Sequence, residues 1–434
     1  VLGLIPAASA SPAGASHLGA YKTIADYLEA QKTTFDQIAP ETKVEFIVEL
    51  EAAPLANSIP AGMKLADYLD TQRGTVQADA IERQQTVMAA AIASCAEDVA
   101  VIRSYKVVFN GFAVSGTYAD KAALEALPGV KRVSVGNTYN VPEKMEAEGE
   151  LITSGEMMNS DAANAEGYTG KGMKIAVIDT GLDLDHPSFA DAPVLTDTSL
   201  ELADIEAVLD KLNAAELYPG VSAEDLYYSE KIPFAFNYVD QNLKASHDYD
   251  DQGYHGSHVA GIAAANAIDS SNVVGVAPEA QVYVMKVFGA NGGAYQDDLM
   301  AAMEDALLLD VDVINMSLGA TSGFSSEDPE IDAIYGRVEY FDTILTISAG
   351  NETQSSYGNM WGTDQNPTSH PDSAVVSSPS TWGGALSIAS ADNSHVLTTY
   401  MTVGNDICAY YDALGLYTDF RSLAGEELEY VMVP

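Results

Sequence analysis

The stretch KIAVI at residues 174–178 decides the fold class, because short apolar runs like it recur through the second half of the chain. Such runs, bounded by turn signals, are typical of strands buried on both faces. Two stretches with helical periodicity, 296–309 and 330–341, lie between them. Strands alternating with helices predict an α/β fold, a parallel sheet with helices on both faces. The other predicted strands are VYVMKV (282–287), VDVINM (311–316), TILTIS (343–348) and ALSIAS (385–390).

A different pattern, over residues 41–141, predicts a smaller α+β unit ahead of this sheet. KVEFIVEL (43–50) alternates apolar and polar residues, as a half-buried strand does. A long helix, one or two strands joined near Asn110-Gly111, a short helix ended by Pro128-Gly129 and a last strand follow, at 76–96, 104–116, 120–129 and 131–135. The order β-α-β-β-α-β is that of a ferredoxin-like unit.

Two further segments separate these patterns. Residues 142–170 are polar and predict a connector between the two units. Residues 190–250 are rich in acidic residues and interrupt the strand–helix rhythm, so we interpret them as a surface insertion with one helix near 200–213.

The composition is that of a folded and strongly acidic protein. Apolar residues make up 47% of the 434 residues, and 20 Lys and Arg stand against 63 Asp and Glu, a net charge of −43. This excess argues against nucleic acid and anionic membranes as partners and fits a well-solvated secreted surface. The two cysteines, Cys95 and Cys408, lie far apart, so a disulfide framework is not predicted.

The first residues, VLGLIPAASASPAGA, indicate export. A short apolar run followed by Ala8-Ser9-Ala10 is typical of the end of a signal peptide, with cleavage after Ala10, and predicts a signal remnant at 1–10 and a leader at 11–40. A ragged apolar terminus is the alternative. No later stretch has the apolar length of a membrane span.

Polar residues follow three of the predicted strands and open one predicted helix. Asp179 follows KIAVI, Asn315–Gly319 follow a later strand, Asn351 comes shortly after TILTIS, and His255 begins a helix of small residues. Taken singly, each has a structural explanation as a cap or turn residue. Because active sites of open parallel sheets lie beyond the carboxyl ends of the strands, together they predict an acid, a base and an oxyanion donor.

Five blocks resemble, in order, those of the subtilisin-like serine proteases: KIAVIDTGLDLDHPSF, HGSHVAGIAA, GVAPEAQVYVMKV, INMSLG and ISAGNE. The resemblance implies a subtilisin-like protease domain at 171–390, with the insertion at 190–250. NGFAVSG and LPGVKRVSV, within 41–141, resemble the inhibitory propeptide of this family. KIPFAFNYVD (231–240) resembles the large bacterial cell-envelope proteinases, and 391–434 resemble the start of their inserted protease-associated domain.

Carried over position by position, the resemblance implies an Asp-His-Ser triad in which Asp179 orients His255 and His255 is the general base. His258 is then a structural neighbour, and Ser257 stands where the family usually has Thr. Asn351 would donate its side-chain amide to the oxyanion.

The resemblance also implies a substrate-binding cleft for a protein or peptide in extended conformation. Ser317, Leu318 and Gly319 would form an edge that pairs with the substrate backbone. Ala349 and Gly350 would line the pocket for the residue before the scissile bond. The attached propeptide would act as an intramolecular inhibitor, so that the chain has the form of a zymogen. We expect the connector after Val135 to run toward the cleft and to block the edge at Ser317–Gly319.

The nucleophile is the departure from the pattern. The family's Gly-Thr-Ser motif does not occur in residues 1–434, and GATSGFSS (319–326) lies in the loop after the substrate edge. We therefore expect the nucleophilic serine beyond Pro434, in a chain truncated at both ends. We also expect residues 1–434 alone not to hydrolyse peptides.

Three other functions fit the sequence less well. A zinc protease needs two His at i, i+4 with Glu between them, whereas His255 and His258 are three apart. A phosphate loop follows a strand, whereas the glycines of GKG (170–172) precede one. The remaining alternative is a non-catalytic subtilase-like module that binds peptides along its edge strand. The intact acid, base and amide argue against it.

The resemblance implies no required cofactor. Calcium sites are frequent in the family and the acid-rich loops are compatible with calcium, but the sequence assigns no metal ligands. The expected location is secreted or associated with a bacterial cell envelope.

Overall fold

The structure is a computed structural model that describes residues 38–139, 154–190, 195, 199–267, 274–290, 293–319, 329–351, 376–391, 400–403 and 406–409. The expected signal remnant at 1–10 and nearly all of the leader at 11–40 lie outside these residues. So does most of 391–434, of which only the antiparallel pair β13 (Tyr400–Val403) and β14 (Asp406–Ala409) is described.

The N-terminal unit has a four-stranded antiparallel sheet in the order β2-β3-β1-β4. Its strands are β1 (Lys43–Leu50), β2 (Ala100–Tyr105), β3 (Gly111–Thr117) and β4 (Val130–Val135). Its helices are α2 (Leu65–Asp70), α3 (Gln72–Ala93) and α4 (Lys121–Glu125), with single 3-10 turns η2 (Leu55–Ser58) and η3 (Tyr118–Asp120). This order of elements is the predicted β-α-β-β-α-β.

Helix α3 begins four residues earlier than the sequence predicts, because Thr71 caps it. The Thr71 hydroxyl accepts a hydrogen bond from Gly74 N at 2.9 Å, which satisfies one free amide of the first turn. The helix ends at Ala93, three residues before the predicted end.

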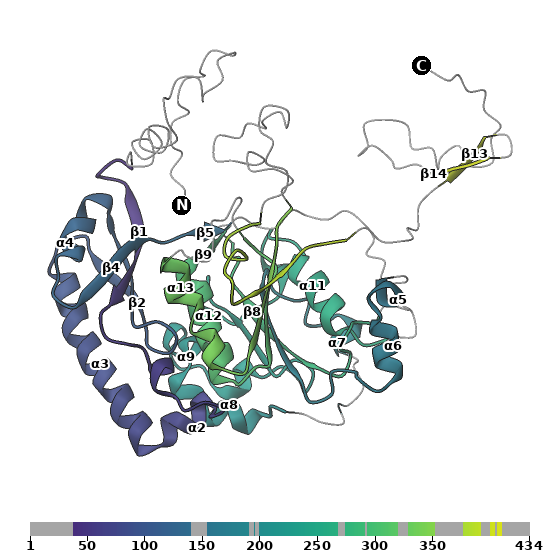
Figure 1. The fold of residues 1–434 in the computed structure, drawn as a ribbon, viewed down its shortest axis with the longest axis horizontal. Helices are drawn as coiled ribbons and strands as arrows, with labels where there is room; N and C mark the ends of the chain where they lie inside the picture. Colours follow the sequence, from purple (N-terminus) through teal and green to yellow (C-terminus); the bar gives the residue numbers. More distant parts are fainter. Residues whose placement is uncertain are drawn as a thin grey trace, which may run out of the picture.

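The second sheet has six strands in the order β12-β11-β10-β6-β8-β7, and all its neighbouring strands are parallel (Figure 1). The predicted parallel sheet is therefore confirmed, with β7 as an additional edge strand. The strands are β6 (Lys174–Asp179), β7 (Phe234–Asn237), β8 (Gln281–Lys286), β10 (Val313–Met316), β11 (Ile344–Ser348) and β12 (Leu386–Ile388).

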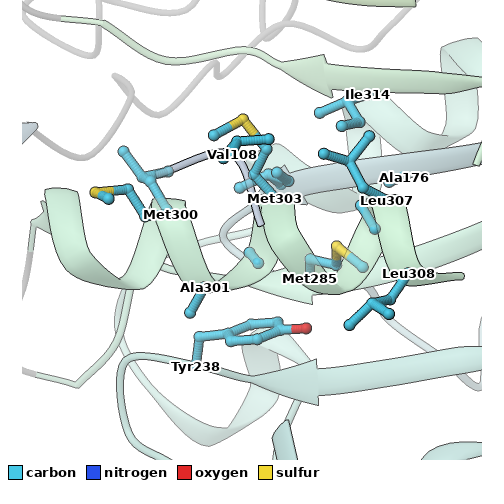
Figure 2. Packing of buried hydrophobic residues seen from close by; sticks show 14 of the residues in the cluster. Val108, Ala176, Tyr238, Met285, Met300, Ala301, Met303, Leu307, Leu308 and Ile314 are labelled. Carbon is cyan, nitrogen blue, oxygen red and sulfur yellow. The ribbon is translucent and has the colours of Figure 1, made fainter. Parts of the chain in front are cut away.

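Helices cover both faces of this sheet, as predicted, since successive side chains of a strand point to opposite faces. Val177 of β6 lies in an apolar cluster with Ala260 and Ala264 of α11 (His255–Ala264). The residues on either side of it, Ala176 and Ile178, lie in a larger cluster with the methionines and leucines of α12 (Gln296–Leu308), part of which Figure 2 shows.

The N-terminal unit shares this larger cluster. Val108 lies beside Met300 and Met303 of α12, and Ile47 of β1 and Ala113 of β3 belong to the same cluster (Figure 2). The prediction of a half-buried β1 is therefore wrong for residues 46–50, all of which are buried. One face of β1 packs on α3, and the other faces the helix layer that contains α12.

The predicted connector and insertion are more ordered than their sequences suggest. The connector holds two short helices, α5 (Ser154–Met158) and α6 (Ser160–Ala165). The insertion holds several short turns of helix in place of one, and its buried residues, among them Ile205 and Leu226, belong to the main core. Its helical elements are α8 (Leu202–Val208), η4 (Leu209–Lys211), α9 (Asn213–Leu217), α10 (Ala223–Leu226) and η5 (His247–Tyr249), and the edge strand β7 also lies within it. Helix α7 (Pro187–Ala190) ends where the insertion begins.

The predicted helix at 330–341 is shorter in the structure. Helix α13 spans Pro329–Tyr335 and a 3-10 turn, η6 (Val338–Tyr340), follows it. Two-residue strands complete the fold: β5 (Thr138–Tyr139) pairs antiparallel with β9 (Ala294–Tyr295). Among the described residues, no helix is both long and apolar enough to cross a membrane.

Candidate active site

The carboxyl ends of three neighbouring strands meet at one edge of the parallel sheet. Ile178 of β6 is in register with Met316 of β10, and Met316 is in register with Ile347 of β11. Asp179, Ser317 and Ser348 therefore stand at the same level, at the edge where ligands bind in open parallel sheets.

Asp179 and His255 meet at this edge. His255 is the first residue of α11, and its Nδ1 lies 2.8 Å from Asp179 Oδ1. In the neutral imidazole, Nδ1 carries the proton when it donates to an ionised carboxylate, and Nε2 then keeps its lone pair. This tautomer is the one that a general base needs. The distance lies within the hydrogen-bond range expected for an acid that orients a base.

The environment of His255 favours its protonated form. Burial lowers the pKa of His255, but the hydrogen bond and negative charge of Asp179 outweigh burial, so the net pKa is raised above its ordinary value. His258 lies one turn along α11. Burial, followed by the charge of His255, lowers its pKa.

Backbone contacts hold the two loops that carry Asp179 and His255 close together. Gly256 N donates to the Thr180 hydroxyl at 2.9 Å, and that hydroxyl donates to Gly253 O at 3.3 Å. A Cβ on Gly256 would lie 2.2 Å from Gly181 O and 3.1 Å from Asp179 Oδ1. Only glycine permits this approach, so the Gly after His255 is a steric requirement of the site.

Asp179 is buried and its two oxygens differ. Oδ1 accepts from His255 and from Thr180 N, the latter at 2.7 Å. Oδ2 is buried and has no hydrogen-bond partner among the residues that the structure describes. Buried polar atoms without partners are uncommon in folded proteins, so each one needs a structural or functional explanation.

The predicted substrate edge and pocket are neighbouring segments. Ser348 Oγ donates to Leu318 O at 3.5 Å, and Ser377 N donates to Ala349 O at 2.8 Å. Ser317 Oγ accepts from Asn315 Nδ2 at 3.0 Å, and a Cβ on Gly319 would lie 2.9 Å from Ser377 Cβ. The structure thus brings Ser317–Gly319 beside Ala349 and Gly350.

Asn351 follows β11 by three residues and is exposed. Gly350 before it has a positive φ of 101°, a conformation that glycine adopts without strain, so the chain turns sharply between the predicted pocket and the predicted oxyanion donor. The roles of Asn351, of the dyad and of the substrate edge stay predictions.

One edge contact was not predicted. The chain leaving the N-terminal unit pairs through Thr138 and Tyr139 with Tyr295 and Ala294. Its continuation at 140–153 lies outside the described residues, so occupation of the Ser317–Gly319 edge by this segment stays a prediction. The sequence offered only a weak signal for β9, because a two-residue strand has no periodicity.

A second unpredicted feature is a lysine beside the dyad. Lys286 ends β8, is fully buried, and contacts both loops of the site. The signal that would have found it is a charged residue inside the apolar run VYVMKV.

The structure assigns no metal ligands in the part of the chain that it describes. The described ranges hold no group of three or more His, Cys, Asp or Glu arranged for a metal ion.

Comparison with known proteins identifies the family to which this fold belongs. Residues 170–414 match the model of the Subtilase family, which is more than half of the chain. The PII-type proteinase of Lacticaseibacillus paracasei is 32% identical over 380 residues, which cover 85% of this chain and 18% of that protein. The chain belongs to the subtilase family, and the subtilisin-like fold is confirmed.

Other relatives are similar over shorter stretches. The Minor extracellular protease Vpr of Bacillus subtilis (strain 168) is 28% identical over 69% of this chain and 32% of that protein. Subtilisin NAT of Bacillus subtilis subsp. natto is 26% identical over 58% of this chain and 49% of that protein. This chain therefore spans about a fifth to a half of the lengths of these relatives.

Proposed function

We propose that this chain carries the acid and base of a serine-type endopeptidase that hydrolyses peptide bonds in proteins. The observation that carries the proposal is the 2.8 Å contact between Asp179 Oδ1 and His255 Nδ1 at the carboxyl edge of the sheet. In this mechanism His255 Nε2 takes the proton of a serine hydroxyl as the serine attacks the scissile carbonyl. Asp179 then stabilises the imidazolium and holds the required tautomer. No serine of residues 1–434 is assigned as that nucleophile.

The same proposal gives roles to the neighbouring segments. Ser317–Gly319 would hold the substrate as an added strand, because main-chain pairing recognises extended peptides without regard to most side chains. Ala349 and Gly350 would line the pocket beside it. The Asn351 amide would donate to the oxyanion, a contact of about 2.7–4 kcal/mol in the transition state when present.

The N-terminal unit, on this proposal, is an intramolecular propeptide that covers the protease domain. Its support is the interface itself. Glu304 Oε1 of α12 accepts from Val107 N at 2.7 Å and Val108 N at 3.0 Å. Arg103 Nη2 donates to Asp298 Oδ1 at 3.0 Å. These contacts surround the shared apolar cluster, and β5 adds a strand to β9 where the chain leaves the unit.

Secretion or association with a bacterial cell envelope is part of the proposal. The acidic composition and the relationship to the Minor extracellular protease Vpr support it. No cofactor is required by the mechanism, and a calcium site, if the protein has one, would be structural.

Hydrolysis of casein by the natural protein tests the reaction class, with fluorophosphonate labelling to report the serine. We expect labelling and cleavage in the wild type and loss of both in His255→Ala, since loss of the base in a subtilisin lowers kcat about 10⁶-fold. His186→Asn is the control, because His186 is exposed and its side chain contacts Ser188 N and the Phe189 ring, away from the dyad. Cleavage that persists in His255→Ala would refute the mechanism, and peptide binding without cleavage would favour the non-catalytic module.

A further inference from the structure

Lys286 lies where the two loops of the candidate dyad come together. It is the last residue of β8, next to β6, and its side chain is fully buried. Lysine is almost never fully buried unless its charge is paired. Its ammonium has two partners, and each belongs to a different loop of the site.

The first partner lies on the acid's loop. Lys286 Nζ donates to the carbonyl oxygen of Thr180, the residue directly after Asp179. Thr180 N in turn donates to Asp179 Oδ1 at 2.7 Å. The lysine therefore holds the peptide between Thr180 and Gly181, which directly follows the peptide whose N–H donates to Asp179.

The second partner lies on the base's loop. Lys286 Nζ is 3.0 Å from Asp250 Oδ2, and the Asp250 side chain is only 3% exposed. Asp250 Oδ1 accepts from Gln252 N at 2.9 Å, which holds the turn that leads into His255. A single ammonium thus joins the loop after β6 to the loop before α11.

A second buried lysine shows what a purely structural role looks like. Lys231 is 2% exposed, and its Nζ donates to Pro278 O and Ala280 O, each at 2.7 Å. Both carbonyls precede β8, at the opposite end of the strand from Lys286. Lys231 therefore ties backbone together away from the dyad, with no carboxylate partner in those contacts.

We propose that Lys286 is a positioning residue that sets the geometry of the Asp179–His255 hydrogen bond by clamping the Thr180 carbonyl to Asp250. The inference rests on the proposed roles of Asp179 and His255 and adds to them a third, non-reacting group. Within the described ranges, the polar contacts of Lys286 are with Thr180 and Asp250 and not with the substrate edge or His255, so it acts through the two loops.

The competing explanation is a through-space effect of the lysine charge. The two explanations predict opposite changes in the pKa of His255 when Lys286 is replaced. Three carboxylates surround Lys286: Asp250, Asp240 and Asp179. Burial has the largest influence and lowers the pKa of Lys286, although the hydrogen bond to Asp250 and these charges oppose it. If the ammonium acted only as a charge, its removal would raise the pKa of His255. If it acts by positioning, its removal loosens the bond to Asp179, and the pKa of His255 falls.

Nuclear magnetic resonance of the chain tests this without any hydrolysis. The wild type is expected to show a strongly downfield proton on His255 Nδ1, and a titration midpoint that reports the contact with Asp179. In Lys286→Met we expect loss of the downfield resonance and a downward shift of the midpoint. Lys231→Met is the matched control and should leave both unchanged.

A second variant guards against misfolding. Lys286→Met leaves Asp250 buried without its partner, which destabilises folded proteins by several kcal/mol in general. The double variant Lys286→Met/Asp250→Asn removes both charges and should show the same loss and the same downward shift. An upward or unchanged midpoint in either folded variant would overturn the inference. Because the readout is the imidazole itself, a failure to cleave casein would not affect this result.

Discussion

Asp179 and Asp305 are both buried aspartates of the same domain, but their surroundings differ. Asp305, on α12, accepts from Asn213 N at 2.7 Å, Asn213 Nδ2 at 2.9 Å, Ala214 N at 2.9 Å and the Tyr238 hydroxyl at 2.9 Å. Asp179 has donors on one oxygen only, and its other oxygen has no partner in the described part of the chain. A carboxylate that anchors structure is fully satisfied, whereas the proposed catalytic one is not.

Other carboxyl groups of α12 are buried in structural contacts as Asp305 is. Burial raises the pKa of Asp305 to about 6 and that of Glu304 to about 7, although hydrogen bonds from backbone amides oppose the change in both. Burial, followed by the charge of Asp297, raises the pKa of Asp298 to about 7. These carboxyl groups hold the insertion and the N-terminal unit in place, so their ionisation affects stability. On the proposed mechanism, the ionisation of His255 would instead affect the reaction.

The largest expected effect separates the two aspartates directly. Asp179→Asn in the natural protein should lower kcat about 10⁴-fold, as loss of the acid does in a subtilisin, because the imidazole then loses its orienting charge. Asp305→Asn should leave the activity of the folded protein nearly unchanged. It should lower the free energy of unfolding by about 2 kcal/mol or more, because one amide oxygen replaces two acceptors for four donors.

Casein hydrolysis and urea unfolding of both variants measure these effects. Equal losses of activity in the two variants, at equal folded fractions, would remove the distinction.

The next largest effect is expected at the interface with the N-terminal unit. Arg103 is buried; its Nη1 donates to Asp297 O at 2.7 Å, and its Nη2 pairs with Asp298. Arg103→Met would leave two buried carboxyl groups without their cation and should lower the free energy of unfolding by about 3–5 kcal/mol. Lys106→Met removes an exposed pair with Glu82 and should cost about 1 kcal/mol or less.

Urea unfolding followed by circular dichroism compares the two variants. Similar small losses would mean that the Arg103 contacts contribute no more than a surface pair.

These interface contacts also mark the limit of what the sequence predicts. The apolar run Ile175–Ile178 predicts β6 correctly, since a continuous apolar run indicates a buried strand whichever strands pair with it. The sequence also predicts the helix at 296–309. Its acidic residues, however, are of a type that usually faces solvent, whereas in the structure they are buried. Their burial depends on Arg103 and Val107, which lie almost 200 residues earlier in the chain.

The candidate site also has parts that the sequence predicts and parts that it does not. Asp179 and His255 can be identified from local sequence motifs, because Asp179 ends a predicted strand and His255 begins a predicted helix. The pairing of β5 with β9, and the contact of Lys286 with Thr180 and Asp250, join segments more than 30 residues apart. No local pattern encodes such contacts, so they required the structure.

A smaller effect is expected from pH at the same interface. The pKa of Glu304 is raised from 4.5 to about 7, so the folded chain binds this proton more tightly than the unfolded chain. Its contribution is therefore fully present below pH 4.5 and is lost as the pH rises through about 7. The linked change is on the order of 3 kcal/mol. Asp298 acts in the same direction.

Glu304→Gln isolates this contribution, because glutamine does not titrate in this range. The wild-type free energy of unfolding in urea should fall between pH 5 and pH 8, and the variant should show a shallower fall. Glu82→Gln, at an exposed position beside Lys106, is the control and should follow the wild type. A fall of equal slope in Glu304→Gln would show that this carboxyl group is not the source.

The smallest expected effect returns to the dyad, at the residue that differs from the family's usual threonine. Ser257 Oγ accepts from Asp183 N at 2.8 Å and lies 3.0 Å from His247 Nδ1. Ser257→Thr keeps the hydroxyl and adds one methyl group at a half-buried position of α11, so activity should change by about twofold or less. Ser257→Ala leaves Asp183 N without its acceptor and should lower the free energy of unfolding by about 1 kcal/mol. Casein hydrolysis and urea unfolding distinguish the two variants. A tenfold loss of activity in Ser257→Thr would show that the dyad depends on the packing of α11 beyond the contact with Asp179.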